Sequence, residues 1–175
     1  HKENVTEGRT LMDRIVLSLL VDNTSGVLSR VSGLFSRRGY NIESLTVGVT
    51  ADERYSRMTV VAFGDQNVLE QIEKQLNKKL DVIKVKTFDT ESSISRELML
   101  IKVKYNKTNR RDIMEICEIM HAQIVDMSKN LMLIQMCDLP ERTQLLIDMF
   151  QSVSIVEVAR TGTLALQKCN ETDLK

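Results

Sequence analysis

The sequence predicts an α+β fold made of two tandem β-α-β-β-α-β modules, each with one antiparallel sheet and both helices on one face. Short apolar segments with a period of two alternate with longer segments whose apolar residues recur every three or four positions. The same order of elements occurs twice within 175 residues. A charged, serine-rich stretch at 89–96 separates the two halves and is predicted to be a linker.

The first module is expected to span residues 14–88. Its first helix carries a basic stripe, Arg30, Arg37 and Arg38, which is expected to be a solvated face, with recognition of a partner protein as the alternative. The helix ends before Gly39, which suits the left-handed residue after a helix. The strands are predicted at 15–21, 41–49, 56–63 and 80–88, and the helices at 26–38 and 66–78. The helix residues predicted to face the core are Val27, Leu28, Val31, Leu34, Phe35, Val68, Leu69, Ile72 and Leu76.

The sheet face without helices would expose apolar residues of the first module. Val47, Val49, Met58 and Val60 are expected near this surface. Because an exposed apolar patch usually marks an interface, we expect a homodimer formed through the first module.

The second module is expected to span residues 97–168 and to repeat the order. Pro140 lies where proline is favoured, in the first turn of a helix. The strands are predicted at 98–105, 123–127, 131–137 and 155–159, with a short edge at 162–166, and the helices at 109–120 and 140–150. The residues predicted to face inward are Ile113, Ile116, Cys117, Met120, Leu145, Leu146, Met149 and Phe150.

Both modules therefore have the element order of ferredoxin-like domains. Residues 1–13 are expected to be a polar leader, derived from a tag at its start, and residues 169–175 a tail.

The composition argues against several classes of function. Lys plus Arg and Asp plus Glu both number 24, so the basic excess typical of nucleic-acid binding is missing. Aromatic residues make up 4%, and the third strand lacks the aromatic pair that stacks bases in RNA-recognition folds. The longest apolar run is too short to span a membrane. The three cysteines, Cys117, Cys137 and Cys169, are far apart, which favours a reducing cytoplasm.

No pattern of catalytic or metal-binding residues is visible. His121 is the only histidine besides His1, and no nucleophile can be placed beside it. No metal-ligand spacing, glycine-rich phosphate loop or pair of carboxylates is present. Acylphosphatase-like enzymes share the strand order, but the first loop lacks their arginine-bearing phosphate cradle. We expect no catalytic residue, metal or cofactor on this chain.

A polar turn, Asp22–Arg30, joins the first strand to the first helix. A helix start offers unpaired N–H groups and partial positive charge, which can bind a carboxylate. The side-chain carbonyl of Asn23 could accept a hydrogen bond from an ammonium, and Asn41 could reach the same place from a second copy. Together these groups describe a site for a free amino acid. The alternative is a capped helix without a ligand, with Asn41 as a turn residue.

Several blocks of sequence resemble a known family. The blocks Asn23–Val31 and Gly33–Val47 are similar to the ACT domain of the small, regulatory subunit of acetohydroxyacid synthase (acetolactate synthase). Ser56–Thr59 and Leu69–Leu76 continue this likeness, and Ile155–Gly162 resembles the end of the C-terminal domain of that subunit. The resemblance covers nearly all of the chain between the leader and the tail.

This resemblance implies a regulatory subunit without an active site of its own. Such a subunit activates a large catalytic subunit that holds thiamine diphosphate, Mg²⁺ and FAD and condenses pyruvate with a second 2-oxo acid. It also confers feedback inhibition by a branched-chain amino acid, most often valine, in valine, leucine and isoleucine biosynthesis. A stand-alone ACT sensor that controls another enzyme or a transcriptional regulator is the alternative.

The resemblance also implies where the effector binds. Its carboxylate is expected to meet backbone N–H groups at Gly26 and Val27. Asn23 would hold the ammonium, and Asn41 of the paired subunit would close over the ligand. With two candidates for the pocket wall, the expected effector-binding residues are Asn23, Gly26, Val27, Leu28, Asn41 and Ile42.

Overall fold

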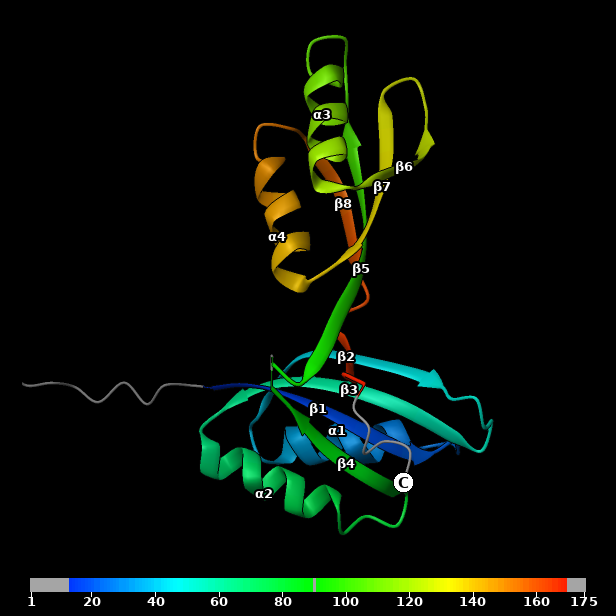
Figure 1. Cartoon of the computed structure of the whole chain (residues 1–175), viewed down its shortest axis with the longest axis vertical. Helices are drawn as coiled ribbons and strands as arrows, with labels where there is room; N and C mark the ends of the chain where they lie inside the picture. Colours follow the sequence, from blue (N-terminus) through cyan, green and yellow to red (C-terminus); the bar gives the residue numbers. More distant parts are fainter. Residues whose placement is uncertain (1–12, 90, 170–175) are drawn as a thin grey trace, which may run out of the picture. The chain divides into compact units, whose positions relative to one another are not determined.

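The structure is a computed structural model that describes residues 13–89 and 91–169 (Figure 1). The predicted leader, apart from Asp13, and the tail beyond Cys169 lie outside the described residues. The described chain divides into two compact units. The first comprises residues up to Glu43 together with Val47–Thr87, and the second comprises Ser44–Thr46 and the chain from Phe88 onward.

The predicted α+β fold of two β-α-β-β-α-β modules is confirmed. The first module contains β1 (Asp13–Asp22), α1 (Val27–Arg37), β2 (Asn41–Val49), β3 (Tyr55–Gly64), α2 (Gln66–Leu76) and β4 (Val82–Phe88). The strand order is β2-β3-β1-β4, so β2 and β4 are the edges of the sheet. Strand β1 pairs antiparallel with β3 along its whole length, from Asp13 opposite Gly64 to Asp22 opposite Tyr55.

The two helices of this module lie on the same face of its sheet (Figure 1). Leu17 and Leu19 of β1 are fully buried, and so are their cross-strand neighbours Val60 and Met58. Neighbours across an antiparallel pair point to the same face, so Met58 and Val60 belong to the core. Their expected place at an exposed surface is therefore wrong, whereas Val47 and Val49 of β2 are exposed as predicted.

The buried face of α1 consists of Val27, Val31, Leu34 and Phe35. The prediction that Leu28 also faces the core is wrong, because its side chain is 46% exposed. Each residue turns an α-helix by about 100°. Leu28 therefore lies at the border of the buried face, in the first turn, where the helix has only begun to cover the sheet.

The second module has one strand more than the first. It contains β5 (Ser93–Lys104), α3 (Arg110–Met120), β6 (Gln123–Met127), β7 (Leu131–Asp138), α4 (Pro140–Met149), β8 (Ile155–Arg160) and β9 (Leu164–Gln167). The main strand order is β6-β7-β5-β8, and β9 pairs with the first residues of β5, Ser93–Arg96. The linker expected at 89–96 is thus partly strand, because polar residues there pair with a strand about 70 residues later.

The core of the second module lies between its sheet and α3 and α4. Ile113, Cys117 and Met120 of α3 are buried, as the spacing predicted. Leu146 of α4 and Phe150, which directly follows this helix, are fully buried, but the prediction for Leu145 is wrong because it is exposed. The core residues are Met99, Ile101, Val103, Ile113, Cys117, Met120, Met132, Ile134, Met136, Leu146, Phe150 and Val153.

A buried polar network draws Thr143 of α4 inward, and Leu145 therefore faces outward. The carboxylate of Glu97 is only 4% exposed and accepts hydrogen bonds from Nε and Nη2 of Arg160 and from Oγ1 of Thr143. Arg160 also donates to Oε1 of Gln144 at 3.0 Å. A charge buried to this extent needs such partners, so Thr143 faces inward and the helix register is set by polar as well as apolar contacts.

Candidate effector-binding site

The turn between β1 and α1 is held in place by its backbone. The N–H of Asp22 donates to the carbonyl of Asp81 at 2.9 Å, and the N–H of Asn23 donates to the carbonyl of Arg54 at 2.7 Å. Gly26 then adopts a φ of 84°, a left-handed conformation that glycine takes at little cost. The chain can therefore turn sharply from the strand into the helix.

No side chain caps the start of α1 within the described part of the chain. Gly26 is the N-cap residue, and its carbonyl accepts the N–H of Arg30 at 3.0 Å. The first N–H groups of a helix have no partner within the helix. Those of Val27 and Leu28 can therefore donate hydrogen bonds to a carboxylate. The alternative of a helix start capped by a side chain does not describe this structure.

The side chain of Asn23 is oriented by the hairpin between β2 and β3. Its Nδ2 donates to the carbonyl of Glu53 at 2.9 Å, and its Oδ1 accepts a hydrogen bond from Oγ of Ser56 at 3.2 Å. Ser56 is buried, so this contact is anchored in the sheet. An amide oxygen has two lone pairs, and Oδ1 can still accept a hydrogen bond from an ammonium group.

Arg30 is a further residue at the start of α1, and the sequence predicts it as part of a basic stripe and not as part of the effector site. Its Nε donates to Oδ2 of Asp81 at 2.6 Å. A Cβ at Gly26 would lie 2.9 Å from Nη1 of Arg30, so the guanidinium occupies space that a side chain at Gly26 would need. The spacing of four residues could have indicated this contact from sequence, whereas the pairing with Asp81 could not.

Asn41 and Ile42 lie at the opposite end of the sheet from Asn23 in the same chain. Thr50 donates to the carbonyl of Tyr55 at the hairpin, so β2 starts at the far end, where Arg14 and Glu43 form an ion pair of 2.8 Å. Ten residues of extended strand separate the two ends, about 30 Å. A single chain therefore brings together Asn23, Gly26, Val27 and Leu28, but neither Asn41 nor Ile42.

His121 has a structural position. It ends α3 with a φ of 57°, and its N–H donates to the carbonyl of Glu118. Across residues 13–89 and 91–169, no group of three or more His, Cys, Asp or Glu side chains could hold a metal ion. Within the same residues, no helix is both long and apolar enough to cross a membrane.

Comparison with known proteins determines the family. Residues 17–84 match the model of the AHAS small subunit-like ACT domain, and residues 96–169 match the model of the small subunit of acetolactate synthase. The probable acetolactate synthase small subunit of Archaeoglobus fulgidus is 46% identical over 155 residues, which cover 89% of this chain and 97% of that protein. The chain belongs to the acetolactate synthase small-subunit family. It is thus a regulatory subunit and not a catalytic one.

Other members of the acetolactate synthase small-subunit family agree in sequence and in structure. The acetolactate synthase isozyme 3 small subunit of Salmonella typhimurium is 44% identical over 156 residues, which cover 89% of this chain and 96% of that protein. The crystal structure of the acetolactate synthase small subunit of Thermotoga maritima superimposes with a TM-score of 0.84 at 34% identity. That match covers 90% of this chain and 99% of the other.

Proposed function

We propose that this chain binds and activates the large catalytic subunit of acetolactate synthase and makes that subunit sensitive to feedback inhibition by a branched-chain amino acid, with valine as the first candidate. Thiamine diphosphate, Mg²⁺ and FAD would be held by the large subunit. Membership of the small-subunit family supports the partner. The uncapped start of α1, with its glycine N-cap, is the observation that carries the proposed effector site.

The groups around Gly26 match the two charged ends of an amino acid. The expected N–H groups of Gly26 and Val27, together with that of Leu28 at the next position and the positive end of the helix dipole, would bind the carboxylate. Arg30 would add a cation beside them, since only its Nε is recorded in an ion pair. Oδ1 of Asn23 would accept a hydrogen bond from the ammonium, and its other bonds keep it in position.

A second chain would complete the site. β2 is an edge strand, and Val47 and Val49 on it are exposed. Two β2 strands that pair antiparallel about a twofold axis would bring the Asn41 end of one strand to the Val49 end of the other. The turn at Asn23 lies at that same end of the sheet. Asn41 and Ile42 of one chain would therefore face the α1 start of its partner.

The side chain of the effector would meet apolar groups. Leu28 and Ile42 are the candidates for the pocket wall, and burial contributes about 0.8 kcal/mol per methylene. Valine, leucine and isoleucine would all gain from such a wall. Discrimination by size alone is therefore modest, and titration with the three amino acids would rank them.

The proposed site is tested by placing a carboxylate where the ligand's own would bind. In Gly26→Asp, the new side chain meets Arg30 and occupies the start of α1, so calorimetry with valine should show no heat of specific binding. Gly33→Ala is the matched control, because a Cβ at Gly33 has no neighbour within 4 Å. Valine binding by Gly26→Asp with unchanged affinity would contradict the site.

The proposed partner is tested by reconstitution. The large subunit should bind this chain and consume pyruvate faster in its presence, and valine should reduce that gain. The chain alone should show no turnover of pyruvate. Failure to associate with the large subunit, together with retained valine binding, would instead favour a stand-alone amino-acid sensor.

A further inference from the structure

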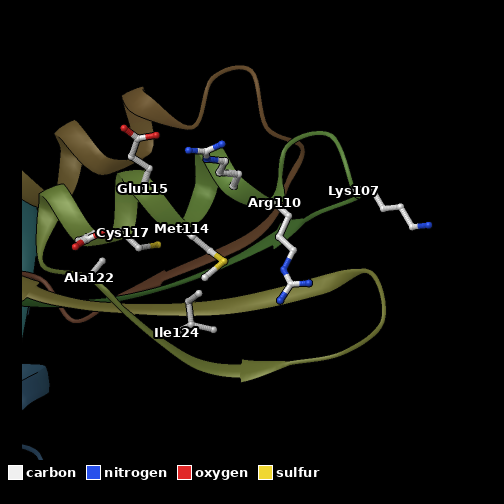
Figure 2. A pocket seen from close by; sticks show the side chains of 9 residues that line it. Lys107, Arg110, Met114, Glu115, Cys117, Ala122 and Ile124 are labelled. Carbon is white, nitrogen blue, oxygen red and sulfur yellow. The ribbon is translucent and has the colours of Figure 1, made fainter.

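A broad groove lies beside α3 in the second unit, and its lining has a distinct chemistry (Figure 2). Its volume is about 780 Å³, and its walls come from α3, the loop before α3 and β6. Figure 2 shows the side chains of Arg110 and Met114 extending from α3 towards the β6–β7 hairpin, with Ile124 below Met114. We name this surface the α3–β6 groove.

One end of the α3–β6 groove carries three cations without recorded ion pairs. Lys107, Arg110 and Arg111 lie at the start of α3, and the structure records no salt bridge to any of them among the residues it describes. A helix start is itself positive, so cations there are unfavourable. Asp112 is the acidic residue of this first turn. The cluster is therefore expected to meet an anion from outside the chain.

The floor of the α3–β6 groove is apolar and partly open to solvent. Met114 and Ile124 line it and are 47% and 37% exposed. Beside them, all five residues of the edge strand β6 are exposed, including Val125 and Met127. Apolar side chains gathered next to an unpaired strand edge are typical of a protein–protein interface.

The two ends of the α3–β6 groove carry charges of opposite sign. The cations lie at the first turn, whereas Glu115 and Glu118 line the groove one and two turns further on. A partner segment would place its acidic residues over Arg110 and Arg111 and its apolar residues against Met114 and Ile124. Its polar or basic residues would face Glu118.

We propose that the α3–β6 groove binds an acidic segment of the large catalytic subunit that also carries apolar side chains. Naming the large subunit as the partner rests on the proposed function. A second copy of this chain fits less well, because twofold pairing through the groove would set only two carboxylates, those of Glu115 and Glu118, against the three cations of the other copy. A small molecule also fits less well, because such sites enclose most of their ligand, and Met114 and Ile124 remain open to solvent.

The charge of the groove is tested with the double variant Arg110→Glu/Arg111→Glu of the full chain. Its affinity for the large subunit should fall at least tenfold, and the dependence of that affinity on salt should become weaker. The control for charge reversal elsewhere on the same unit is Lys104→Glu, which reverses one charge where the double variant reverses two. Lys104 follows the buried Val103 on β5 and so points to the sheet face away from the helices. Affinity of the double variant within twofold of the unchanged chain would overturn the proposal.

A second measurement identifies the partner directly. A carbodiimide joins an amine to a carboxylate only when they touch, so Lys107 should be cross-linked to an Asp or Glu of the large subunit in the assembled complex. Cross-links from Lys107 only to this chain or to a second copy of it would overturn the proposal. Met114→Ser, at a half-exposed position, should also weaken the complex, and an unchanged affinity would count against the apolar floor.

The outcomes separate this proposal from the proposed function. Valine binding by the free double variant should remain unchanged, because Arg110 and Arg111 belong to the second unit and the turn at Gly26 belongs to the first. An unchanged chain that forms no complex with the large subunit would overturn both the partner and the groove. An unchanged affinity of every variant for the large subunit would overturn the proposed role of the α3–β6 groove but not the proposed partner.

Discussion

At Gly26 the absence of a side chain shapes the candidate site. A φ of 84° disfavours any other residue, and a Cβ would lie 2.9 Å from Nη1 of Arg30. The guanidinium can therefore stay close to the first N–H groups of α1 while Asp81 holds its Nε. The ion pair is about half exposed and adds little to stability, so its main effect is to position Arg30.

Asn41 should matter for the effector and not for the dimer. On the proposed pairing, Asn41→Ala removes one polar contact to the ligand, and the affinity for valine should fall about tenfold, the size expected for a hydrogen bond to a charged group. Sedimentation velocity should show the same dimer as in the unchanged chain. If Asn41→Ala binds valine with unchanged affinity, Asn41 does not contact the effector and is only a turn residue.

The three cysteines should differ in reactivity. Burial raises the pKa of the Cys117 thiol to about 11, so at pH 8 only roughly one molecule in a thousand carries the thiolate that reacts. Cys137 and Cys169 are exposed. A disulfide reagent at pH 8 should therefore label two thiols of the native chain quickly and the third only after unfolding.

Cys137→Ser is the control for this assignment and should leave one fast thiol. Three fast thiols in the native chain would mean that Cys117 is open to solvent. Because the pKa of Cys117 is raised, its reactivity should increase as the pH rises towards 11.

At the scale of elements, the two helices of the first module begin differently. Asp65 is the N-cap of α2, and its carboxylate accepts the N–H of Val68 at 2.9 Å. Asp65→Ala should lower the free energy of unfolding by about 1 kcal/mol, and Asp65→Asn should largely retain it. Urea denaturation measures both.

Ser25→Ala, just before α1, is the comparison for the Asp65 variants. The structure records no hydrogen bond from the Ser25 side chain within its described residues, so this substitution should change the free energy of unfolding by less than about 0.5 kcal/mol. A larger loss would mean that Ser25 caps α1 in solution, which would leave one N–H group fewer for a ligand.

The order of elements could be predicted from sequence because apolar periodicity is local. The errors fall where a distant partner decides. Leu145 is exposed because Thr143 reaches inward to Glu97, which lies 46 residues earlier. The first residues of β5 form a strand because β9 pairs with them. The prediction for Met58 and Val60 is wrong because both faces of β3 are buried or half-buried, so alternation along this strand does not distinguish the core face.

Only the local part of the candidate site could be predicted from sequence. The turn itself, with Asn23 and Gly26, can be seen in a short stretch of sequence. The contacts that orient it come from far away in the chain, from Glu53 and Ser56 to Asn23 and from Asp81 to Arg30. Spacing along the sequence contains no information about such contacts.

At the scale of the whole molecule, regulation requires coupling between two binding events. If the large subunit and valine prefer different states of this chain, each must weaken the binding of the other by the same factor. Calorimetry of valine with the free chain and with the assembled complex should therefore show weaker binding in the complex. The ratio of the two affinities should equal the ratio of large-subunit affinities without and with saturating valine. Equal valine affinities would mean that the two events are not coupled.

The separation of Asn41 from Asn23 by the length of a strand has a consequence for how this protein would respond in dilute solution. On the proposed pairing, an isolated monomer carries only part of each effector site, because Asn41 and Ile42 come from the second chain. Diluting the protein to a concentration below the dissociation constant of the dimer should therefore abolish sensing even though every chain stays folded. Raising the amount of protein should restore the response at an unchanged metabolite level.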